Sequence, residues 1–275
     1  MLPDRGVPVT GGDTLSLFYS GKLHDLFASR PRPYRTGAMG VILITHVQKV
    51  CSLKYLSVQF DQRLRPSELP YFRSAVIEKT RRADDLFHNH RSDTAVIYRY
   101  PLIQYKLLRG RAGIVCLDEG TDAIHNLFQV RDLDLRIGRQ IRTFRVQDMH
   151  LTHHDLHLTE RPNRYYLRDY LPFNSQNFQR WTSLSGNTPA QLDLLTGTLR
   201  GNLLAMAKGL GWWIEGRVEV RPLHLYRVRT QPYKGQPMLC LDLSFMTNVV
   251  LPVGVGLGKG VSVGFGVLEN LNDKK

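Results

Sequence analysis

Alternation of apolar and polar residues marks the first ordered element of the chain. The segment LKYLSVQF, within residues 41–60, alternates in this way, which predicts a half-buried β-strand. Ser67 and Glu68 then open a run with helical spacing of its apolar residues, SELPYFRSAVIEKTRR, which ends near Arg82. A strand followed by a helix is the beginning of a unit that mixes both kinds of structure.

Two more strand-like runs follow, AVIYRYPLIQYKLL and RAGIVCLDEG, with a turn at residues 109–111 between them. Residues 122–130 have helical spacing, and residues 133–143 are typical of another strand. The order is therefore strand, helix, strand, strand, helix, strand. This order predicts a ferredoxin-like unit, the layout that RNA-recognition domains also use.

The second half of the chain repeats this order less regularly. Strand-like stretches across residues 141–170 precede a helix near 175–181 and a longer helix over 189–208, which Gly209 and Gly211 end. Residues 217–220, 224–230 and 238–245 are again strand-like. We predict an α+β fold of two tandem ferredoxin-like domains with a C-terminal glycine-rich loop. The expected divisions are an N-terminal extension (1–42), a first domain (43–143) and a second domain (144–275).

The glycine-rich loop is the segment PVGVGLGKGVSVGFGVL, residues 252–268, in which one lysine lies among glycines that let the backbone approach a partner closely. Valines and Phe265 alternate with the last glycines, which indicates a loop between two strands rather than the strand-to-helix loop of a nucleotide-binding motif. Two interpretations remain open: a hairpin at a crowded strand crossing, or a cradle for a nucleic-acid backbone. The second interpretation assigns RNA contacts to Gly256, Gly258, Lys259, Gly260, Gly264 and Gly266.

The charge balance favours the nucleic-acid interpretation. The chain has 37 Lys and Arg against 24 Asp and Glu, a net charge of +13. Such an excess predicts a polyanionic partner, because basic side chains release condensed counterions when they neutralise phosphates. Two strand-like runs are rich in arginine, RDLDLRIGRQIRTFR and RVEVRPLHLYRVRT, and the second includes Tyr226. We therefore add Arg139 and Arg142 of the first run to the predicted RNA-binding residues, together with Arg73 of the first predicted helix and Lys208 at the end of the long helix.

Composition argues against several other classes. No apolar run approaches the roughly 18 residues of a membrane span and no signal-peptide layout is present, which favours a cytoplasmic protein without a membrane partner. The three cysteines, Cys51, Cys116 and Cys240, lie far apart in apolar runs, so we expect reduced core residues. The segment MHLTHHDLHLTE is rich in histidine but has no His-Glu-x-x-His helix. We predict no metal site and no cofactor.

Three features together resemble a known family: the tandem ferredoxin-like order, the run GLGKGVSVGFG, and an HNH segment followed by YRYPLIQYK. Over about residues 45–268 the chain is similar to the CRISPR-associated endoribonuclease six family of the repeat-associated RNA-binding superfamily, whose members cut CRISPR precursor transcripts. It is most similar to the subtype-b branch, in which a histidine-x-histidine loop precedes a YPxxQYK strand.

The resemblance implies a metal-independent endoribonuclease that binds CRISPR repeat RNA. Cleavage would proceed by attack of a 2′-hydroxyl and leave a 2′,3′-cyclic phosphate and a 5′-hydroxyl. It also implies a catalytic histidine in the loop LFHNHRSD, assisted by a lysine from the preceding helix and a tyrosine from the following strand. The matching residues are His88, His90, Lys79, and Tyr98 or Tyr100.

Other interpretations of these residues stay open. Histidine can act as base or acid near neutral pH, but His88 and His90 can equally be solvent-exposed loop residues without a catalytic role. Tyr98 and Tyr100 suit a half-buried strand equally well. The alternative function is a non-catalytic RNA-binding subunit of a CRISPR effector complex, and a ferredoxin-like metal enzyme ranks third. The sequence is compatible with a monomer or a homodimer.

Overall fold

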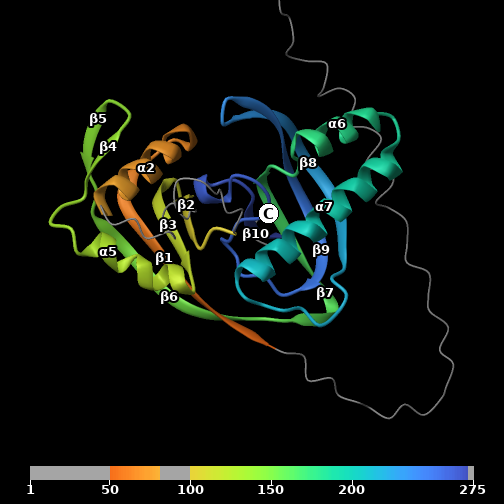
Figure 1. Cartoon of the computed structure of the whole chain (residues 1–275), viewed down its shortest axis with the longest axis horizontal. Helices are drawn as coiled ribbons and strands as arrows, with labels where there is room; N and C mark the ends of the chain where they lie inside the picture. The colour runs from red at the N-terminus through yellow and green to blue at the C-terminus, as the bar shows by residue number, and fades with distance from the viewer. Residues whose placement is uncertain (1–49, 81–99, 272–275) are drawn as a thin grey trace, which may run out of the picture.

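The computed structural model describes residues 50–80 and 100–271, which form two lobes that lie side by side (Figure 1). The first lobe contains a four-stranded antiparallel sheet with the order β2-β3-β1-β6. Its strands are β1 (Cys51–Arg63), β2 (Ile103–Leu108), β3 (Arg111–Leu117) and β6 (Val146–Leu156). Helices lie on one face: η2 (Pro66–Glu68), α2 (Leu69–Thr80), α4 (Glu119–Ala123) and α5 (His125–Phe128).

The predicted turn between β2 and β3 is confirmed. Arg109 and Gly110 both have positive φ, 52° and 76°, as a two-residue hairpin turn requires for its twist to match the strands. By contrast, the interpretation of residues 133–143 as the fourth strand of the first sheet is wrong. Gly138, at φ 63°, folds this run into a separate hairpin of β4 (Asp134–Ile137) and β5 (Gln140–Thr143). β6 takes the place beside β1 instead.

The second lobe has the same sheet topology, β10-β7-β9-β8. Its strands are β7 (Leu158–Tyr170), β8 (Val220–Tyr233), β9 (Gln236–Val249) and β10 (Val267–Asn270). The runs 217–220 and 224–230, predicted as two strands, belong largely to the single strand β8, which has a bulge between Pro222 and His224. In both sheets the first and third strands are central, so the prediction of two ferredoxin-like units is confirmed.

The two helices of the second lobe begin as the sequence predicts. α6 (Ser175–Ser183) is capped by the side chain of Asn174, which accepts a hydrogen bond from the Asn177 N–H. α7 (Thr188–Gly209) is capped in the same way by Asn187, whose side-chain oxygen accepts a hydrogen bond from the Ala190 N–H. A ferredoxin-like unit would place a second helix between β9 and β10. In that position the chain has residues 250–266, with only one short turn of 3₁₀-helix, η3 (Val261–Val263).

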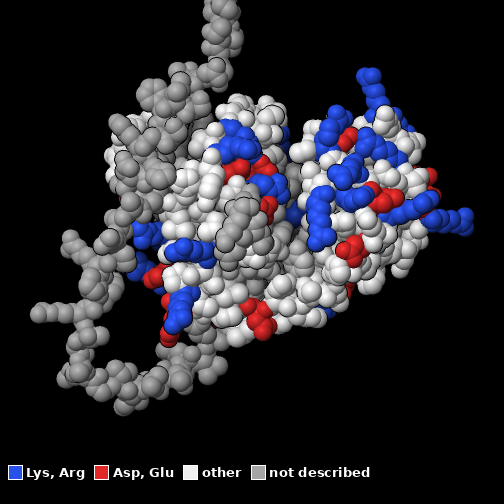
Figure 2. All heavy atoms as spheres, turned by 180° about the vertical axis from the view of Figure 1, so that it is seen from behind, with Lys and Arg blue, Asp and Glu red and all other residues white. Residues whose placement is uncertain are grey.

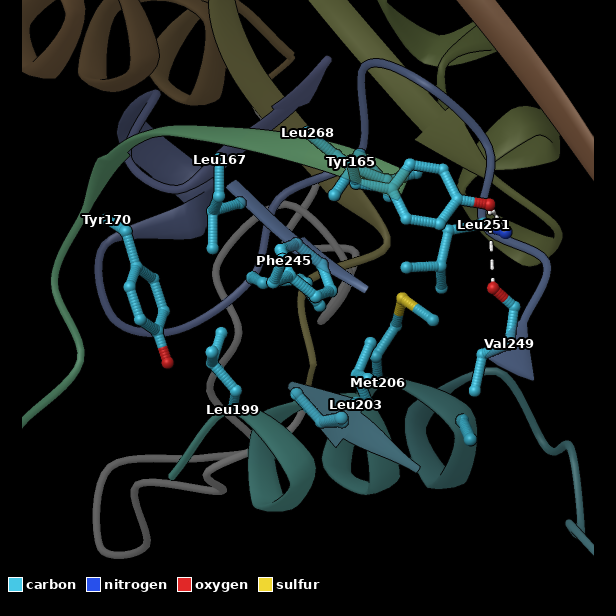
Figure 3. Close-up of a cluster of buried hydrophobic side chains, with 14 of the residues drawn as sticks. Tyr165, Leu167, Tyr170, Leu199, Leu203, Met206, Phe245, Val249, Leu251 and Leu268 are labelled. Atoms are coloured by element: carbon cyan, nitrogen blue, oxygen red, sulfur yellow. Dashed lines mark hydrogen bonds between the residues drawn. The ribbon is translucent and has the colours of Figure 1, made fainter. Parts of the chain in front are cut away.

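Two clusters of buried side chains form the core. Phe60, Phe72 and Phe144 pack as an aromatic group between the first sheet and α2, with ring centroids 5.3–6.0 Å apart. In the second lobe, side chains of α7 such as Leu199, Leu203 and Met206 face Leu167 and Phe245 of the sheet (Figure 3).

The second cluster is not confined to its own lobe. Leu53, Val115 and Leu117 project from the face of the first sheet that α2 leaves uncovered, and they pack into the same cluster. The two lobes therefore share a continuous core. No helix in the described part of the chain is long and apolar enough to cross a membrane.

Candidate nucleic-acid interface

The glycine-rich loop lies between the two lobes, and its last two residues, 267 and 268, belong to β10. Its glycines permit close contact: a side chain on Gly258, at φ 87°, would lie 2.5 Å from the Tyr170 ring and 2.9 Å from the Leu171 carbonyl oxygen. A side chain on Gly264 would lie 2.6 Å from Leu69, the first residue of α2. These distances are too short for any Cβ atom, so the loop packs directly on elements of both lobes.

The segment before β2 and β2 itself hold the loop in place through two hydrogen bonds, and a third hydrogen bond joins the two side chains that make them. The Tyr100 hydroxyl donates to the Gly256 carbonyl oxygen at 2.8 Å, and the Gln104 side-chain amide donates to the Tyr100 hydroxyl at 3.1 Å. The Gly256 N–H in turn donates to the Gln104 side-chain oxygen at 3.0 Å. Burial raises the pKa of the Tyr100 hydroxyl well above its usual range, so it remains a donor at neutral pH. The YPxxQYK run and the glycine-rich loop are thus parts of one structure.

Within the loop, the glycines differ in how accessible they are. Gly256 and Gly266 are buried, and their N–H and carbonyl groups bond to other parts of the protein. Gly258, Lys259 and Gly260 are partly exposed. The N–H groups of Gly258 and Gly260 have no hydrogen-bond partner among the described residues, and both glycines have left-handed backbone, at φ 87° and 70°. Two unpaired N–H groups beside a lysine suit an anion.

Lys106, the last residue of the YPxxQYK run, is buried on the side of β2 that faces the loop. Its side chain is on the same face as that of Gln104, two residues earlier, and its Cα lies 3.9 Å from the position of a Cβ on Gly264. The residue is 1% exposed, and its ammonium has no hydrogen-bond partner in the described part of the protein. Burial, and secondarily the charge of Arg168, lowers the pKa of Lys106 to about 7.

Lys79, predicted to assist catalysis, lies in the last turn of α2. Its ammonium forms an ion pair with Asp132 at 2.6 Å, which holds the pKa of that carboxyl below its usual value. Arg73 lies two turns earlier on α2 and is close enough to Tyr105 of β2 to act on it electrostatically. α2 therefore carries two cations, Arg73 and Lys79, between its contact with the loop at Leu69 and its last residue, Thr80. His88, His90 and Tyr98 lie outside the described residues.

Comparison with known proteins identifies the family. The model of the Cas6b N-terminal domain matches residues 51–155, and the model of the Cas6b C-terminal domain matches residues 157–271. This chain belongs to the Cas6b family. The two matches meet between β6 and β7, the point where the chain passes from the first sheet to the second.

Solved structures with this fold include two described as Cas6b. A crystal structure of Cas6b has a TM-score of 0.71 and 24% identity, over 80% of this chain and 100% of that one. A second, described as a CRISPR RNA processing endoribonuclease Cas6b, has a TM-score of 0.60 and 20% identity, over 79% of this chain and 98% of its own. Among curated sequences, an uncharacterized protein of Methanocaldococcus jannaschii is 28% identical over 101 residues, which are 37% of this chain and 67% of that protein.

The other predicted RNA-binding residues of this Cas6b protein lie in different places. Arg139 is exposed in the turn between β4 and β5. Arg142 pairs with Glu68 at 2.8 Å, so part of its charge is already neutralised. Lys208 is exposed near the end of α7, next to Gly209, whose backbone packs directly on the Tyr100 side chain. Lys208 therefore lies close to the hydrogen-bonded group of Tyr100, Gln104 and Gly256, whereas Arg139 and Arg142 belong to the separate hairpin.

Basic side chains also cover much of the surface. Figure 2 shows Lys and Arg gathered over the lobe that holds α2 and the β4–β5 hairpin, with a smaller group on the second lobe; Asp and Glu lie among them on both lobes. The histidine-rich segment forms β6, where His150 contacts Asp148 at 2.8 Å and His154 packs edge-on against Tyr55. Among the described residues, no group of three or more His, Cys, Asp or Glu is arranged to hold a metal ion.

Two residues of this interface were not assigned a role from the sequence, Gln104 and Lys106. Both are polar, both lie in the YPxxQYK run, and they alternate with Ile103 and Tyr105, which point into the core of the first lobe. Period-two spacing therefore placed them together on the opposite face. The glycine-rich loop covers this face in the folded protein. That is a tertiary contact, and the spacing of residues along the strand does not reveal it.

Proposed function

We propose that this protein is a metal-independent endoribonuclease that binds CRISPR repeat RNA and cleaves precursor CRISPR transcripts. Membership of the Cas6b family across both domains carries this proposal. A structure with the same fold is described as a CRISPR RNA processing endoribonuclease. The net charge of +13 supplies the attraction for a polyanion that such a reaction needs.

The chemistry requires only proton transfer and positive charge. The 2′-hydroxyl oxygen attacks the adjacent phosphorus while a base takes its proton, and the bond from phosphorus to the 5′-oxygen breaks as an acid protonates that oxygen. The products are a 2′,3′-cyclic phosphate and a 5′-hydroxyl. His88 and His90 are the proposed base and acid, because an imidazole with an ordinary pKa of about 6.5 serves either purpose near neutrality.

Three further groups assist in this proposal. Lys79, in its ion pair with Asp132, contributes positive charge at the end of α2 that leads into the histidine segment. The Gly258 and Gly260 N–H groups and Lys259 receive a phosphate of the RNA. The Tyr100 hydroxyl is committed to Gly256, so Tyr100 acts by positioning the loop, which favours Tyr98 as the tyrosine that assists at the reacting atoms.

The decisive experiment uses repeat RNA in EDTA, with and without a 2′-deoxy nucleotide at the cleavage position. We expect cleavage of the all-ribose RNA in the chelator, a cyclic phosphate on one product, and no cleavage of the deoxy RNA. Cleavage of the deoxy RNA would exclude attack by the 2′-hydroxyl, and activity that EDTA removes would indicate a metal enzyme. Tight binding without cleavage between about pH 6 and 9 would favour a non-catalytic subunit of a CRISPR effector complex.

Single substitutions test the two histidines. His88→Ala and His90→Ala should slow cleavage by about a hundredfold or more, since a general acid or base contributes on that order, while RNA affinity changes little. His125→Ala, in α5, is the matched control and should cleave normally. Equal losses of binding and cleavage in the two loop variants would instead indicate that these histidines are structural.

A further inference from the structure

The second sheet has one face packed against α7 and another that carries polar and aromatic side chains, which we call the open face. Residues paired across an antiparallel sheet project from the same side. Leu167, Leu243 and Leu225 are paired and face α7. Their neighbours along each strand therefore point to the open face.

Three rows of side chains cross the open face. The first consists of Arg164, Met246 and Arg221, and the second of Tyr166, Ser244 and His224. The third consists of Asp242 and Arg227, with Arg168, Asp169 and Arg229 beside them. Successive rows are two residues, about 6.6 Å, apart along β7 and β9, and three residues apart along β8, where a bulge lies between one row and the next.

The middle row carries an aromatic platform. A bulge in β8 between Leu225 and Arg227 inserts Tyr226 as an extra residue. The bulge changes the direction in which the Tyr226 side chain points. The Tyr226 ring lies 5.3 Å from the Tyr166 ring and 4.5 Å from the His224 ring, centroid to centroid. These rings flank the small side chain of Ser244, so Tyr226 covers the middle of the row. With 53% of its surface exposed, Tyr226 offers a ring to solvent on a base of packed aromatics.

Charge on the open face is unevenly neutralised. At the third row, Arg168 and Arg229 pair with Asp169 and Asp242, and Arg168 also pairs with Glu269 of β10, which lies opposite Tyr166 of the second row. Arg164 and Arg221 are both exposed and have no ion-pair partner among the described residues. Arg227 has a side chain that is 66% exposed and lies 3.9 Å from Asp242. Arg164 and Arg221 thus lie on one side of the aromatic row without an ion-pair partner among the described residues, and the largely exposed Arg227, which is near Asp242, lies on the other side.

We propose that the open face binds unpaired nucleotides of RNA, with one base stacked on Tyr226 and the neighbouring phosphates contacted by Arg164, Arg221 and Arg227. Every base has a flat face that can stack on an aromatic ring, whereas the bases of a duplex are already stacked on one another. The ligand is therefore single-stranded. The inference rests on the proposed function only in taking RNA as the ligand, and it requires no cleavage.

The test measures affinity for an unstructured RNA of about twelve nucleotides without a repeat sequence, and for an RNA duplex of equal charge. Tyr226→Ala should weaken single-strand binding about tenfold and leave duplex binding unchanged, because base stacking on one aromatic ring contributes on that order. Tyr226→Trp should retain the affinity. Arg164→Gln with Arg221→Gln should lower the slope of log affinity against log salt by about 0.7 for each arginine. A 4-thiouridine RNA should cross-link to the β8 peptide.

The control is Phe178→Ala, which removes a 39% exposed aromatic ring from α6, away from the open face. Melting temperatures of all variants establish that they are folded. Unchanged single-strand affinity in Tyr226→Ala, an equal loss for duplex and single strand, or equally good competition by inorganic polyphosphate would each overturn the proposal. If the wild-type protein binds RNA on this face but never cleaves repeat RNA, the proposed function fails and this inference stands.

Discussion

At the scale of single residues, Lys106 shows how a polar side chain in the interior changes stability with pH. Its folded pKa of about 7 lies below the ordinary value of 10.5, because the low-dielectric surroundings penalise the charged form. Between these two values the unfolded chain holds a proton that the folded chain lacks. The unfolding free energy contributed by this residue therefore rises as the pH rises from about 7 toward 10.5, and the penalty is greatest below pH 7.

We predict that Lys106→Met stabilises the protein, since a chain of similar length without an amine avoids that penalty. The gain in unfolding free energy should be largest at pH 6 to 7 and should shrink steadily toward pH 10. Urea denaturation of both proteins at several pH values measures it. Lys54→Met removes a half-exposed lysine and should show no comparable pH trend. A destabilising Lys106→Met would mean that the amine is charged and paired in the folded protein, and a gain that does not vary with pH would mean that folding does not lower its pKa.

Tyr100 illustrates a second point at this scale. A tyrosine near a predicted catalytic loop was compatible with catalysis or with packing, and its type and spacing did not distinguish them. The hydrogen bonds to Gly256 and Gln104 assign it a definite structural contact, because a buried hydroxyl requires partners.

At the scale of elements, the segment between β9 and β10 replaces the second helix of a ferredoxin-like unit. Its glycines and Pro252 disfavour a helix, and at Gly258, Gly264 and Gly266 a Cβ atom would overlap neighbouring atoms. Gly266 is the tightest point: it has a left-handed backbone at φ 63°, and a Cβ there would overlap the Leu257 carbonyl.

Gly266→Ala should therefore lower the unfolding free energy by about 2 kcal/mol or more, through left-handed strain and the displaced carbonyl. Gly197→Ala is the matched control, because Gly197 is in the middle of α7 with open space where a Cβ would point. Alanine at that position should stabilise by up to about 1 kcal/mol, the difference in helix propensity. Chemical denaturation compares the two. A neutral Gly266→Ala would show that the loop is not packed as described.

At the scale of the whole molecule, the two lobes share side chains across their boundary. Leu117 lies on β3 of the first sheet, is 0% exposed, and packs into the cluster that holds α7 and the second sheet. A core of this kind couples the unfolding of the lobes, because neither lobe can open without exposing apolar surface of the other.

We predict one cooperative unfolding transition for the described lobes, and a loss of about 3 kcal/mol in Leu117→Ala, within the usual cost of truncating a buried leucine. Hydrogen exchange should show reduced protection in β7 and β9 as well as in β1 and β3. Protection lost only in the first sheet, or two separate calorimetric transitions, would mean that the lobes fold independently.

Local patterns in the sequence determined much of this protein. Period-two alternation located β1, Gly209 and Gly211 marked the end of α7, and the turn at residues 109–111 specified the hairpin between β2 and β3, because each depends on near neighbours alone. The same patterns were insufficient for residues 133–143, where a strand-like run folds back on itself and β6 pairs with β1 instead. The strand that occupies the edge of a sheet is selected by its pairing with strands that are distant in the sequence. The composition of the strand itself does not identify these partners.

Only the tertiary structure determines which of the sequence motifs contact one another. The glycine-rich loop and the YPxxQYK run were recognised separately, about 150 residues apart, and only the fold joins them through Tyr100, Gln104 and Gly256. The ion pair of Lys79, the burial of Lys106 and the aromatic platform at Tyr226 likewise arise from contacts between distant segments. A sequence specifies residue types and local conformation, whereas charge neutralisation and burial depend on which surfaces meet when the chain folds.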